Sequence, residues 1–460
     1  MNETSQLAEH IANIRYSELS GEVVEKAKCL VLDQLGCQLA FATLPWSKSV
    51  YEYVKSKETT QRESTVAYYG LKTNAEEAAF ANAAFGHGFE MDDTELLTAS
   101  HPGVVVMSSA LAMGEAKAIS GREFIAAVVA GYDAMIRANL AARTMMNRGF
   151  HSTAVAGPFG SAAATGKILG FSPDMMLNAL GIAASTSAGL AEYSLSGGSV
   201  KRVHAGFAAQ SGMRAAFLAQ FGITGPSSAL EGEKGFCRAF SDERCVEEIT
   251  KDLGKDFKIM LTGNKPYCCC AAQHAVIDAT AAIAKGHAIR PDQVAEIVVE
   301  QRPREVMAVG NIVEPQDIVS SQFSARFGLG LRLVKGSNGF QDYTEKNLKN
   351  AEILAVARKV KYVADEKYEK LKVDGAPALV TITMKDGSQY REQVDYAKGT
   401  RQNPMLWPEL ETKFRGLVDG IITSQAAEEI VDTIKHLNEL DNVQKLASLL
   451  VANAGKASCS

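Results

Sequence analysis

Residues 85–103, FGHGFEMDDTELLTASHPG, gather the residue types that carry proton-transfer chemistry. An alanine-rich run that Asn74 opens precedes them, and a run of small apolar residues, 104–116, follows. Both runs predict helices, and polar side chains between buried helices are costly unless they are paired or used. We therefore expect a site here, with the candidate residues Glu90, Asp92, Asp93, Thr94 and His101. The alternative is structural: Asp92, Asp93 and Thr94 could merely cap the next helix.

Other polar segments interrupt apolar or small sequence at residues 148–153, 194–204, 264–267 and 321–327. The candidates that they supply are His151, Lys201, Arg202, His204, Lys265 and Arg326. Cations at the start of a helix oppose its macrodipole, so an anion bound near Lys201 and Arg202 explains them better than a structural role. The alternatives are that His151 is a helix cap or a satisfied core histidine, and that Lys265 and Arg326 are ordinary exposed charges.

Histidines, lysines, an arginine and carboxylates together suit proton transfer on a substrate that itself carries carboxylates. Lysine and arginine would bind its anionic groups, and a histidine or an acidic residue would move a proton at carbon or at a leaving hydroxyl. The sequence has no GxxxxGK[ST] phosphate loop and no GxGxxG motif after a strand, so nucleotide binding is not expected. It also has no GxSxG motif, which would place a nucleophilic serine. The consecutive cysteines at 268–270 are poorly spaced for zinc, and neither a metal nor a cofactor is implied.

The elements that must position these residues are mostly helices. Helical periodicity runs almost without interruption from about residue 5 to 240, with many small residues that let helices pack closely. The pattern changes near Gly263. Residues 294–300 predict a strand, and 378–384 with 389–394 predict a hairpin closed by a Lys-Asp-Gly-Ser turn. Helical runs are predicted at residues 323–334, 347–362, 407–417, 424–436 and 441–454.

We therefore predict a mainly α protein with two domains. A large all-helical domain would be built from both chain ends, residues 1–264 and 399–460. An α+β lid domain with a small antiparallel sheet, residues 265–398, would be inserted in it, and a ligand would bind in the cleft between them.

Composition sets further bounds. The 460 residues include 46% hydrophobic and 22% charged residues, as in ordinary soluble globular proteins. A net charge of −5 and a pI near 6.0 argue against nucleic-acid binding. The N-terminus does not resemble a signal peptide, and no apolar run is expected to reach the roughly 20 residues that span a bilayer. The eight cysteines are irregularly placed, which does not suggest a disulfide framework, and we expect a cytoplasmic protein.

Ordered segments along nearly the whole chain resemble the MmgE/PrpD family. They are NAAFGHGFEMDDT with SHPG, RGFHSTAVAGPFGSAAA, SVKRVHAGFAAQSG, GITGPSSALEGEKGF, KPYCCCAAQHAVIDA and RQNPMLWPELETKFRGL. This family includes 2-methylcitrate dehydratase, cis-aconitate decarboxylase and iminodisuccinate epimerase. The resemblance implies a two-domain enzyme, usually a homodimer, that works without metal or cofactor. Its active site would lie in the cleft.

The resemblance also implies roles for single residues. Thr94 and His101 match the polar pair after the acidic cluster, and His151 matches the histidine of an RGFH-like segment. Lys201 matches the lysine before an H-x-G, and Lys265 the lysine that opens the lid domain. Two positions depart from the family pattern. Glu90 stands where members often have aspartate, and Phe327, preceded by Arg326, stands where several have tyrosine. These departures leave the substrate and the reaction subtype open.

The leading hypothesis is a lyase that acts on a small di- or tricarboxylate, most similar to the 2-methylcitrate dehydratase hydro-lyases. The predicted catalytic residues are His101, His151, Lys201, Lys265, Asp93 and Thr94, and the predicted substrate-binding residues are Glu90, Arg202, His204 and Arg326. One histidine would take a proton and the other would give one, which suits an unperturbed pKa of about 6.5. A decarboxylase of an unsaturated tricarboxylate and an epimerase are alternatives on the same site. A non-catalytic carboxylate-binding protein is the alternative from another class.

Overall fold

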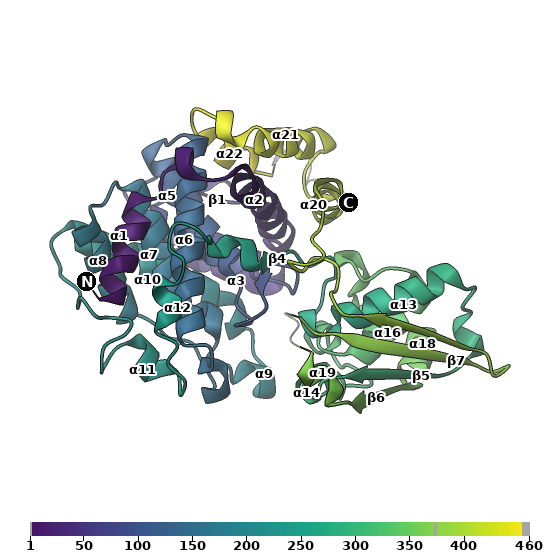
Figure 1. Cartoon of the computed structure of the whole chain (residues 1–460). Helices are drawn as coiled ribbons and strands as arrows, with labels where there is room; N and C mark the ends of the chain where they lie inside the picture. The colour runs from purple at the N-terminus through teal and green to yellow at the C-terminus, as the bar shows by residue number, and fades with distance from the viewer. Residues whose placement is uncertain (1, 372–374, 453–460) are drawn as a thin grey trace. The chain divides into compact units, whose positions relative to one another are not determined.

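The computed structural model describes residues 2–371 and 375–452, and the chain forms two compact units. Residues 1–262 and 407–460 make up the helical unit, and residues 263–406 make up the α/β unit. Helices predominate and the sheets are small, which confirms the predicted mainly α class (Figure 1).

The helical unit holds the longest helices of the chain. Its main helices are α1 (Glu3–Asn13), α2 (Gly21–Phe41), α3 (Pro45–Lys55), α4 (Ala75–Gly86), α5 (Pro102–Lys117), α6 (Gly121–Ala141), α7 (Ser152–Ile168), α8 (Pro173–Ala184), α10 (Val200–Gln220), α20 (Trp407–Val418), α21 (Ser424–Lys435) and α22 (Gln444–Leu449). The short helices are α9 (Tyr193–Ser196), α11 (Phe236–Phe240) and α12 (Glu247–Thr250), and the short strands are β1 (Ser64–Val66), β2 (Leu71–Thr73) and β3 (Thr94–Glu95). A further short strand, β4 (Thr262–Gly263), pairs with β3 and runs from the last residue before residue 263 into the α/β unit. The predicted helix at residues 441–454 is shorter than expected, and residues 453 and 454 lie outside the described part of the chain.

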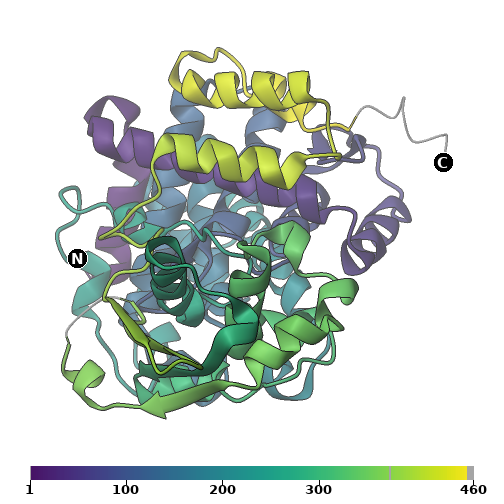
Figure 2. The same cartoon turned by 90° about the vertical axis from the view of Figure 1, so that its right-hand side faces the viewer.

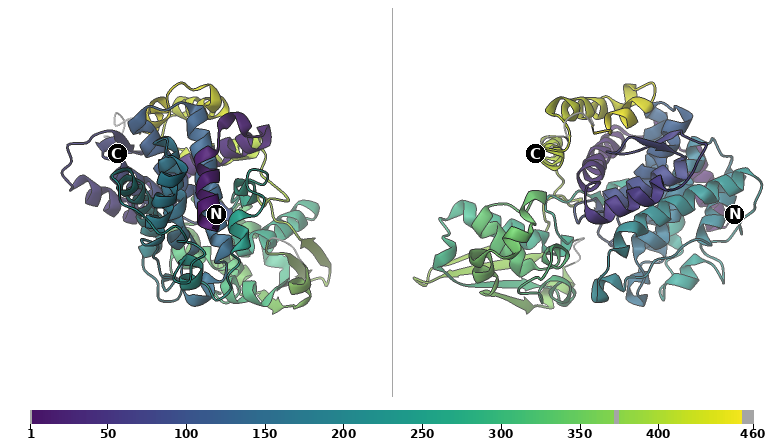
Figure 3. Two further views of the ribbon diagram at one scale, coloured as in Figure 1. Left: turned by 60° about the vertical axis from the view of Figure 1, so that its left-hand side comes forward. Right: turned by 180° about the vertical axis from the view of Figure 1, so that it is seen from behind.

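Both ends of the chain contribute to this unit. The C-terminal helices α20 and α21 pack on α2, and α1 packs on α8 (Figures 2 and 3). Inside, α7 packs against α6 and α10 through small residues. A Cβ added at Gly131 of α6 would lie 2.8 Å from the carbonyl oxygen of Gly160 on α7, so the two backbones nearly touch there. The small residues predicted to allow close helix packing do so.

Helix α6 corrects one expectation from the sequence. It is long and apolar enough, by length and composition, to cross a membrane, although we expected no run of that kind. Its most apolar stretch is entirely buried, as is usual for the core helix of a folded domain. The charged residues within it, Asp133 and Arg137, form an ion pair with each other at 2.8 Å, which lowers the cost of their burial.

The α/β unit is built on a four-stranded sheet with the strand order β6-β5-β7-β8. Its strands are β5 (Val294–Gln301), β6 (Val360–Ala364), β7 (Ala378–Met384) and β8 (Gln389–Val394). Its helices are α13 (His274–Gly286), α14 (Pro303–Val309), α15 (Ile318–Gln322), α16 (Ala325–Lys335), α17 (Glu345–Leu348), α18 (Ala351–Ala357) and α19 (Lys367–Lys370). Apolar residues of the sheet, α13, α16 and α18 form the core.

The predicted antiparallel sheet is in fact mixed. The hairpin β7–β8 and the pair β5–β7 are antiparallel, but β5 and β6 are parallel. The connection from β5 to β6 passes through several helices, which is long enough to return the chain in the same direction. The predicted helix at 347–362 ends at Ala357, and its last part forms β6, where Val360, Tyr362 and Val363 favour a strand.

Candidate active site

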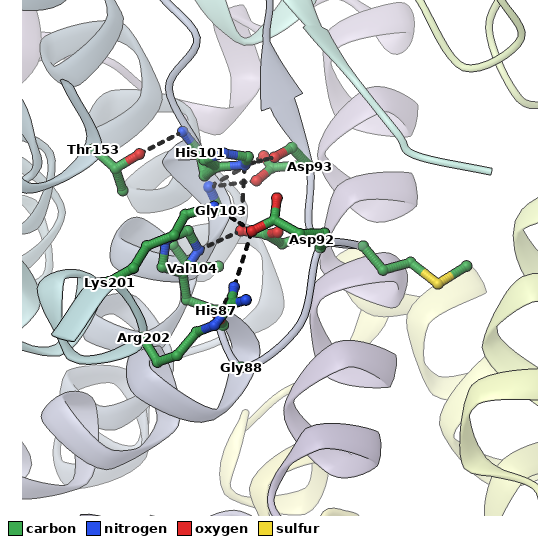
Figure 4. Close-up of polar contacts among 12 residues, drawn as sticks. His87, Gly88, Asp92, Asp93, His101, Gly103, Val104, Thr153, Lys201 and Arg202 are labelled. Carbon is green, nitrogen blue, oxygen red and sulfur yellow. Dashed lines mark hydrogen bonds and ion pairs between the residues drawn. The ribbon is translucent and has the colours of Figure 1, made fainter. Parts of the chain in front are cut away.

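The candidate residues of the helical unit meet where helices α4, α5, α7 and α10 begin or end (Figure 4). His101 is the residue before α5, and Pro102 opens that helix. His151 is the residue before α7, and Lys201 and Arg202 lie in the first turn of α10. His87 follows the last residue of α4. Three helix N-termini are thus placed at one point, where unpaired backbone N–H groups favour negative charge.

Asp92 lies between two imidazole rings. Its Oδ2 atom is 2.7 Å from Nδ1 of His87 and 3.3 Å from Nδ1 of His101. Nδ1 of His101 is also 2.7 Å from the main-chain oxygen of Asp93. Because carboxylate and carbonyl oxygens only accept, Nδ1 of each ring carries a hydrogen, and in a neutral ring Nε2 then has the lone pair. The main-chain N–H of His101 donates to Oγ1 of Thr153 at 3.0 Å.

Asp93 supports the start of α5. Its carboxylate accepts the N–H of Gly103 at 3.0 and 3.1 Å and the hydroxyl of Tyr132 at 2.7 Å. A Cβ at Gly103 would lie 2.9 Å from both carboxylate oxygens, so only glycine fits. Burial raises the pKa of Asp93 to about 7, and the nearby Asp92 adds to this. Asp93 therefore does cap the start of α5, as the structural alternative expected, and it also binds the hydroxyl of Tyr132.

His151 and His204 form a second pair. Their Nδ1 atoms are 3.0 Å apart, so one ring donates to the other and both cannot be protonated at these atoms. Burial, His87 and Lys201 hold the pKa of His151 well below its ordinary value, and the same influences lower the pKa of His204 to about 4. Both imidazoles are therefore neutral near pH 7 in the free protein.

Glu90 is bonded to two cations. Its Oε1 atom accepts from Nζ of Lys201 and, at 2.9 Å, from Nη1 of Arg202. Nη1 of Arg202 also lies 3.3 Å from the main-chain oxygen of His87. All three charged side chains are buried, where such ion pairs need further hydrogen bonds to balance desolvation. Glu90 was predicted to bind substrate; the structure shows it paired with the two cations, and its contact with substrate stays a prediction.

The remaining predicted residues are Thr94 in the helical unit and Lys265 and Arg326 in the α/β unit. Thr94 is buried on β3, directly after Asp93. Lys265 is only 2% exposed, so it is not an ordinary surface charge. Arg326 donates to the main-chain oxygens of Gly310, at 2.7 Å, and Val360, contacts that favour a structural role for it.

The sequence interpretation missed residues that the structure places at this site. His87 was not selected, although it lies five residues before Asp92 at the end of an alanine-rich helix, which was a usable signal. Tyr193 lies 5.4 Å from His151 and 5.7 Å from His204 between ring centroids. Tyr132, inside the apolar helix α6, gave no signal. Within residues 2–371 and 375–452, no group of three or more His, Cys, Asp or Glu side chains is placed to hold a metal ion.

Comparison with known proteins gives matches along most of the chain. Residues 5–248 match the family model of the MmgE/PrpD N-terminal domain, and residues 267–439 match that of the MmgE/PrpD C-terminal domain. The chain is 29% identical to cis-aconitate decarboxylase of Aspergillus terreus, over 97% of this chain and 95% of that protein. It is 25% identical to cis-aconitate decarboxylase of Mus musculus and 24% identical to that of Homo sapiens, over 97% of this chain and 93% and 94% of those proteins.

Proposed function

The chain belongs to the MmgE/PrpD family, and from this premise we propose that it is a decarboxylase of a small unsaturated polycarboxylate, with cis-aconitate as the first candidate substrate. It is an enzyme of the lyase type, as the sequence predicted. From the sequence, a dehydratase was the leading hypothesis and a decarboxylase was an alternative. The named relatives favour the second, because cis-aconitate decarboxylases match over 97% of the chain.

The single observation that carries the proposal is the grouping of neutral histidines with buried cations at helix N-termini. Loss of CO2 from a carbon next to a C=C bond leaves an electron pair that moves through the double bond. A proton must then be delivered at the far carbon, so the site needs an acid and groups that hold the remaining carboxylates. Lys201, Arg202 and the N-termini of α5, α7 and α10 favour such anions.

The depressed pKa values suit this task. A buried histidine with a low pKa is a strong acid once protonated. Bound carboxylates bring negative charge near His101 and His151, and this charge raises the pKa of a neighbouring imidazole. In the proposed mechanism substrate binding loads a proton onto one of these histidines, which then passes it to carbon as CO2 leaves.

A turnover screen in D2O tests the proposal. Purified protein is incubated with cis-aconitate, citrate, methylcitrate or aspartate-derived diacids, and the products are followed by proton NMR and CO2 release. We expect CO2 from cis-aconitate and one deuterium in the product. Loss of water from methylcitrate or citrate without CO2 release would return the dehydratase, and deuterium exchange without net reaction would indicate an epimerase. Binding without turnover would support a carboxylate-binding protein.

We also propose that the protein is a cytoplasmic homodimer. Large apolar side chains on one face of α10 and just beyond it are exposed, and they support an interface between copies: Val200, Phe207, Leu218, Phe221 and Ile223. Phe221 is 85% exposed, which is unusual for a phenylalanine with no partner protein. Light scattering should give twice the mass of one chain, and Phe221→Asp combined with Phe207→Asp should halve it. A wild-type monomer would refute the homodimer.

A further inference from the structure

His87 is the most deeply buried member of the histidine cluster. Its side chain is fully buried, and its ring centroid lies 5.1 Å from that of His101 and 5.7 Å from that of His151. Nδ1 donates to Asp92, but Nε2 has no hydrogen-bond partner among the described residues. A buried polar atom without a partner costs free energy, which a leucine of similar size would not. The structure therefore calls for a role that an apolar residue could not fill.

The contact with Asp92 supplies that role. Asp92 is buried, and the same oxygen, Oδ2, faces the Nδ1 atoms of both His87 and His101. The shorter contact, 2.7 Å, belongs to His87, and the longer, 3.3 Å, to His101. A buried carboxylate that has lost its best donor tends to gain a proton or to draw one onto a neighbouring base. Without His87, the base that remains in contact with this oxygen is His101.

We propose that His87 is a positioning residue, which stabilises the Asp92 carboxylate and so sets the pH at which His101 takes up a proton. His101 then exchanges protons with substrate through Nε2. The inference rests on the proposed function only in giving His101 a catalytic role. His87 itself acts through Asp92 and needs no contact with substrate.

Other charges near these rings also bear on the titration. Those that act on these rings, or on Asp92 and Asp93, are Lys26, Asp33 and Cys37 on α2, Tyr132 on α6, His151 before α7, and Lys201, Arg202 and His204 on α10. Behind them, Glu90 pairs with Lys201 and Arg202, and Lys413 on α20 pairs with Asp33. Lys201 and Arg202 lower the pKa of His87, as burial does, while Asp92 opposes both. With His87 neutral, its Nδ1–H bond to Asp92 is a hydrogen bond that stabilises the charged carboxylate.

The test compares two variants of His87. His87→Asn keeps an N–H donor close to the position of Nδ1, whereas His87→Leu removes it. Nitrogen-15 NMR of the histidine rings, without substrate, reports the tautomer and the titration midpoint of His101. We expect the midpoint to rise by about one pH unit or more in His87→Leu and to stay near the wild-type value in His87→Asn. The same shift should appear in the limb of the pH profile of kcat/KM that reports His101.

Asp92→Asn provides a second measurement if His87→Leu does not fold. Loss of the carboxylate charge should move the His101 midpoint to lower pH. An unchanged midpoint in His87→Leu, or in Asp92→Asn, would overturn the proposal. So would an equal loss of kcat/KM at every pH in both His87 variants, because that is the result of a merely structural role. The NMR measurement needs no turnover, so it stands even if the turnover screen finds no substrate.

Discussion

The helical unit buries one charged cluster around Arg137 and another around His87, and the two satisfy their charges in different ways. Arg137 is completely buried and pairs with Asp133 at 2.8 Å. It also donates to the main-chain oxygens of Lys251, at 2.7 Å, and Asp256, at 3.0 Å. Burial would raise the pKa of Asp133, but the hydrogen bond from His10 and the charge of Arg137 outweigh it and hold that pKa below its ordinary value.

The cluster around His87 has the opposite electrostatics. His151 faces His87, His204 and Lys201, and these neighbours lower its pKa instead of stabilising its charge. In the Arg137 cluster, main-chain oxygens accept the hydrogen bonds of the guanidinium, and these bonds hold α6 against the end of α12 and the segment that follows it. The His87 cluster would gain most from an anion that arrives from outside. The difference indicates that the first cluster serves stability and the second serves chemistry.

Arg137→Ala should separate these roles most strongly. It leaves Asp133 as a buried charge with fewer partners, and breaking a buried pair typically costs about 3–5 kcal/mol. Urea unfolding should show this loss, while kcat of the folded fraction changes little. Arg143→Ala is the matched control, because Arg143 pairs with Glu243 at the surface and should cost less than about 1 kcal/mol. Equal losses in the two variants would contradict a structural role specific to the Arg137 cluster.

His151→Asn should have the reverse effect. Loss of an acid–base group typically lowers turnover by about 10²–10⁴-fold, and we expect at least a hundredfold decrease in kcat. The free energy of unfolding should hardly fall, because burial and the neighbouring Lys201 already hold the wild-type ring neutral. Both quantities are measured on the same preparation. Wild-type kcat, or a loss of stability comparable to that of Arg137→Ala, would place His151 with the structural cluster.

Local patterns predicted much of the fold. The hairpin at 378–384 and 389–394 coincides with β7 and β8, because alternating residues and a tight turn are encoded within a few positions. Helix α4 begins directly after Asn74, the residue that opens the alanine-rich run, and the Asn74 side chain accepts the main-chain N–H of Glu77. The parallel pairing of β6 with β5 was missed, since it joins residues about 60 positions apart and depends on packing that no local pattern records.

The site was predictable by residue type more than by partner. The structure brings Glu90, Asp93, His101, His151, Lys201, Arg202 and His204 together in the helical unit, as residues of one site would be. What the sequence could not show is which oxygen meets which nitrogen. Glu90, for example, is bonded to Lys201, which lies 111 positions away in the sequence. His87 was overlooked because its importance lies in a contact with Asp92 across a turn.

The pH dependence of stability sharpens the comparison further. The pKa of His204 is lowered to about 4, so between that value and about 6.5 the unfolded chain binds a proton that the folded chain does not. Stability from this group is therefore complete above about pH 6.5 and is lost as the pH falls toward 4. Asp93, with a pKa raised to about 7, acts in the opposite direction. For this reason the difference between wild type and a variant is the informative quantity.

His204→Asn should reduce the loss of stability on acidification by about 2 kcal/mol between pH 7 and pH 4.5. The amide keeps a hydrogen-bonding group close to Nδ1 of His151, and Asp93 is present in both proteins. Urea unfolding of wild type and variant at several pH values gives the difference. Parallel curves would mean that His204 titrates alike in the folded and unfolded chains, and that the cluster is not held neutral as proposed.

The smallest expected effect is that of Glu90→Gln, which tests how much positive charge Lys201 and Arg202 present to the substrate. In the wild type one carboxylate oxygen is shared by Lys201 and Arg202, so their combined charge is partly cancelled. Removal of that negative charge should strengthen the attraction for carboxylates in a buried site, where screening is weak. We expect KM to fall by about tenfold for a tricarboxylate and by less for a dicarboxylate, at about 1.4 kcal/mol per tenfold.

The matched control is Glu76→Gln, which removes the partner of Arg214 at the other end of α10 and should leave KM unchanged. A higher KM for both substrates would mean that Glu90 holds the two cations in the geometry that substrate needs. In that case Glu90 resembles Asp133, a carboxylate that organises cations, and the contrast between the clusters would lie in the histidines alone. A KM that falls more for the tricarboxylate than for the dicarboxylate would instead show that Glu90 offsets the charge of Lys201 and Arg202. In that case the offset sets how strongly the site prefers one anion over another.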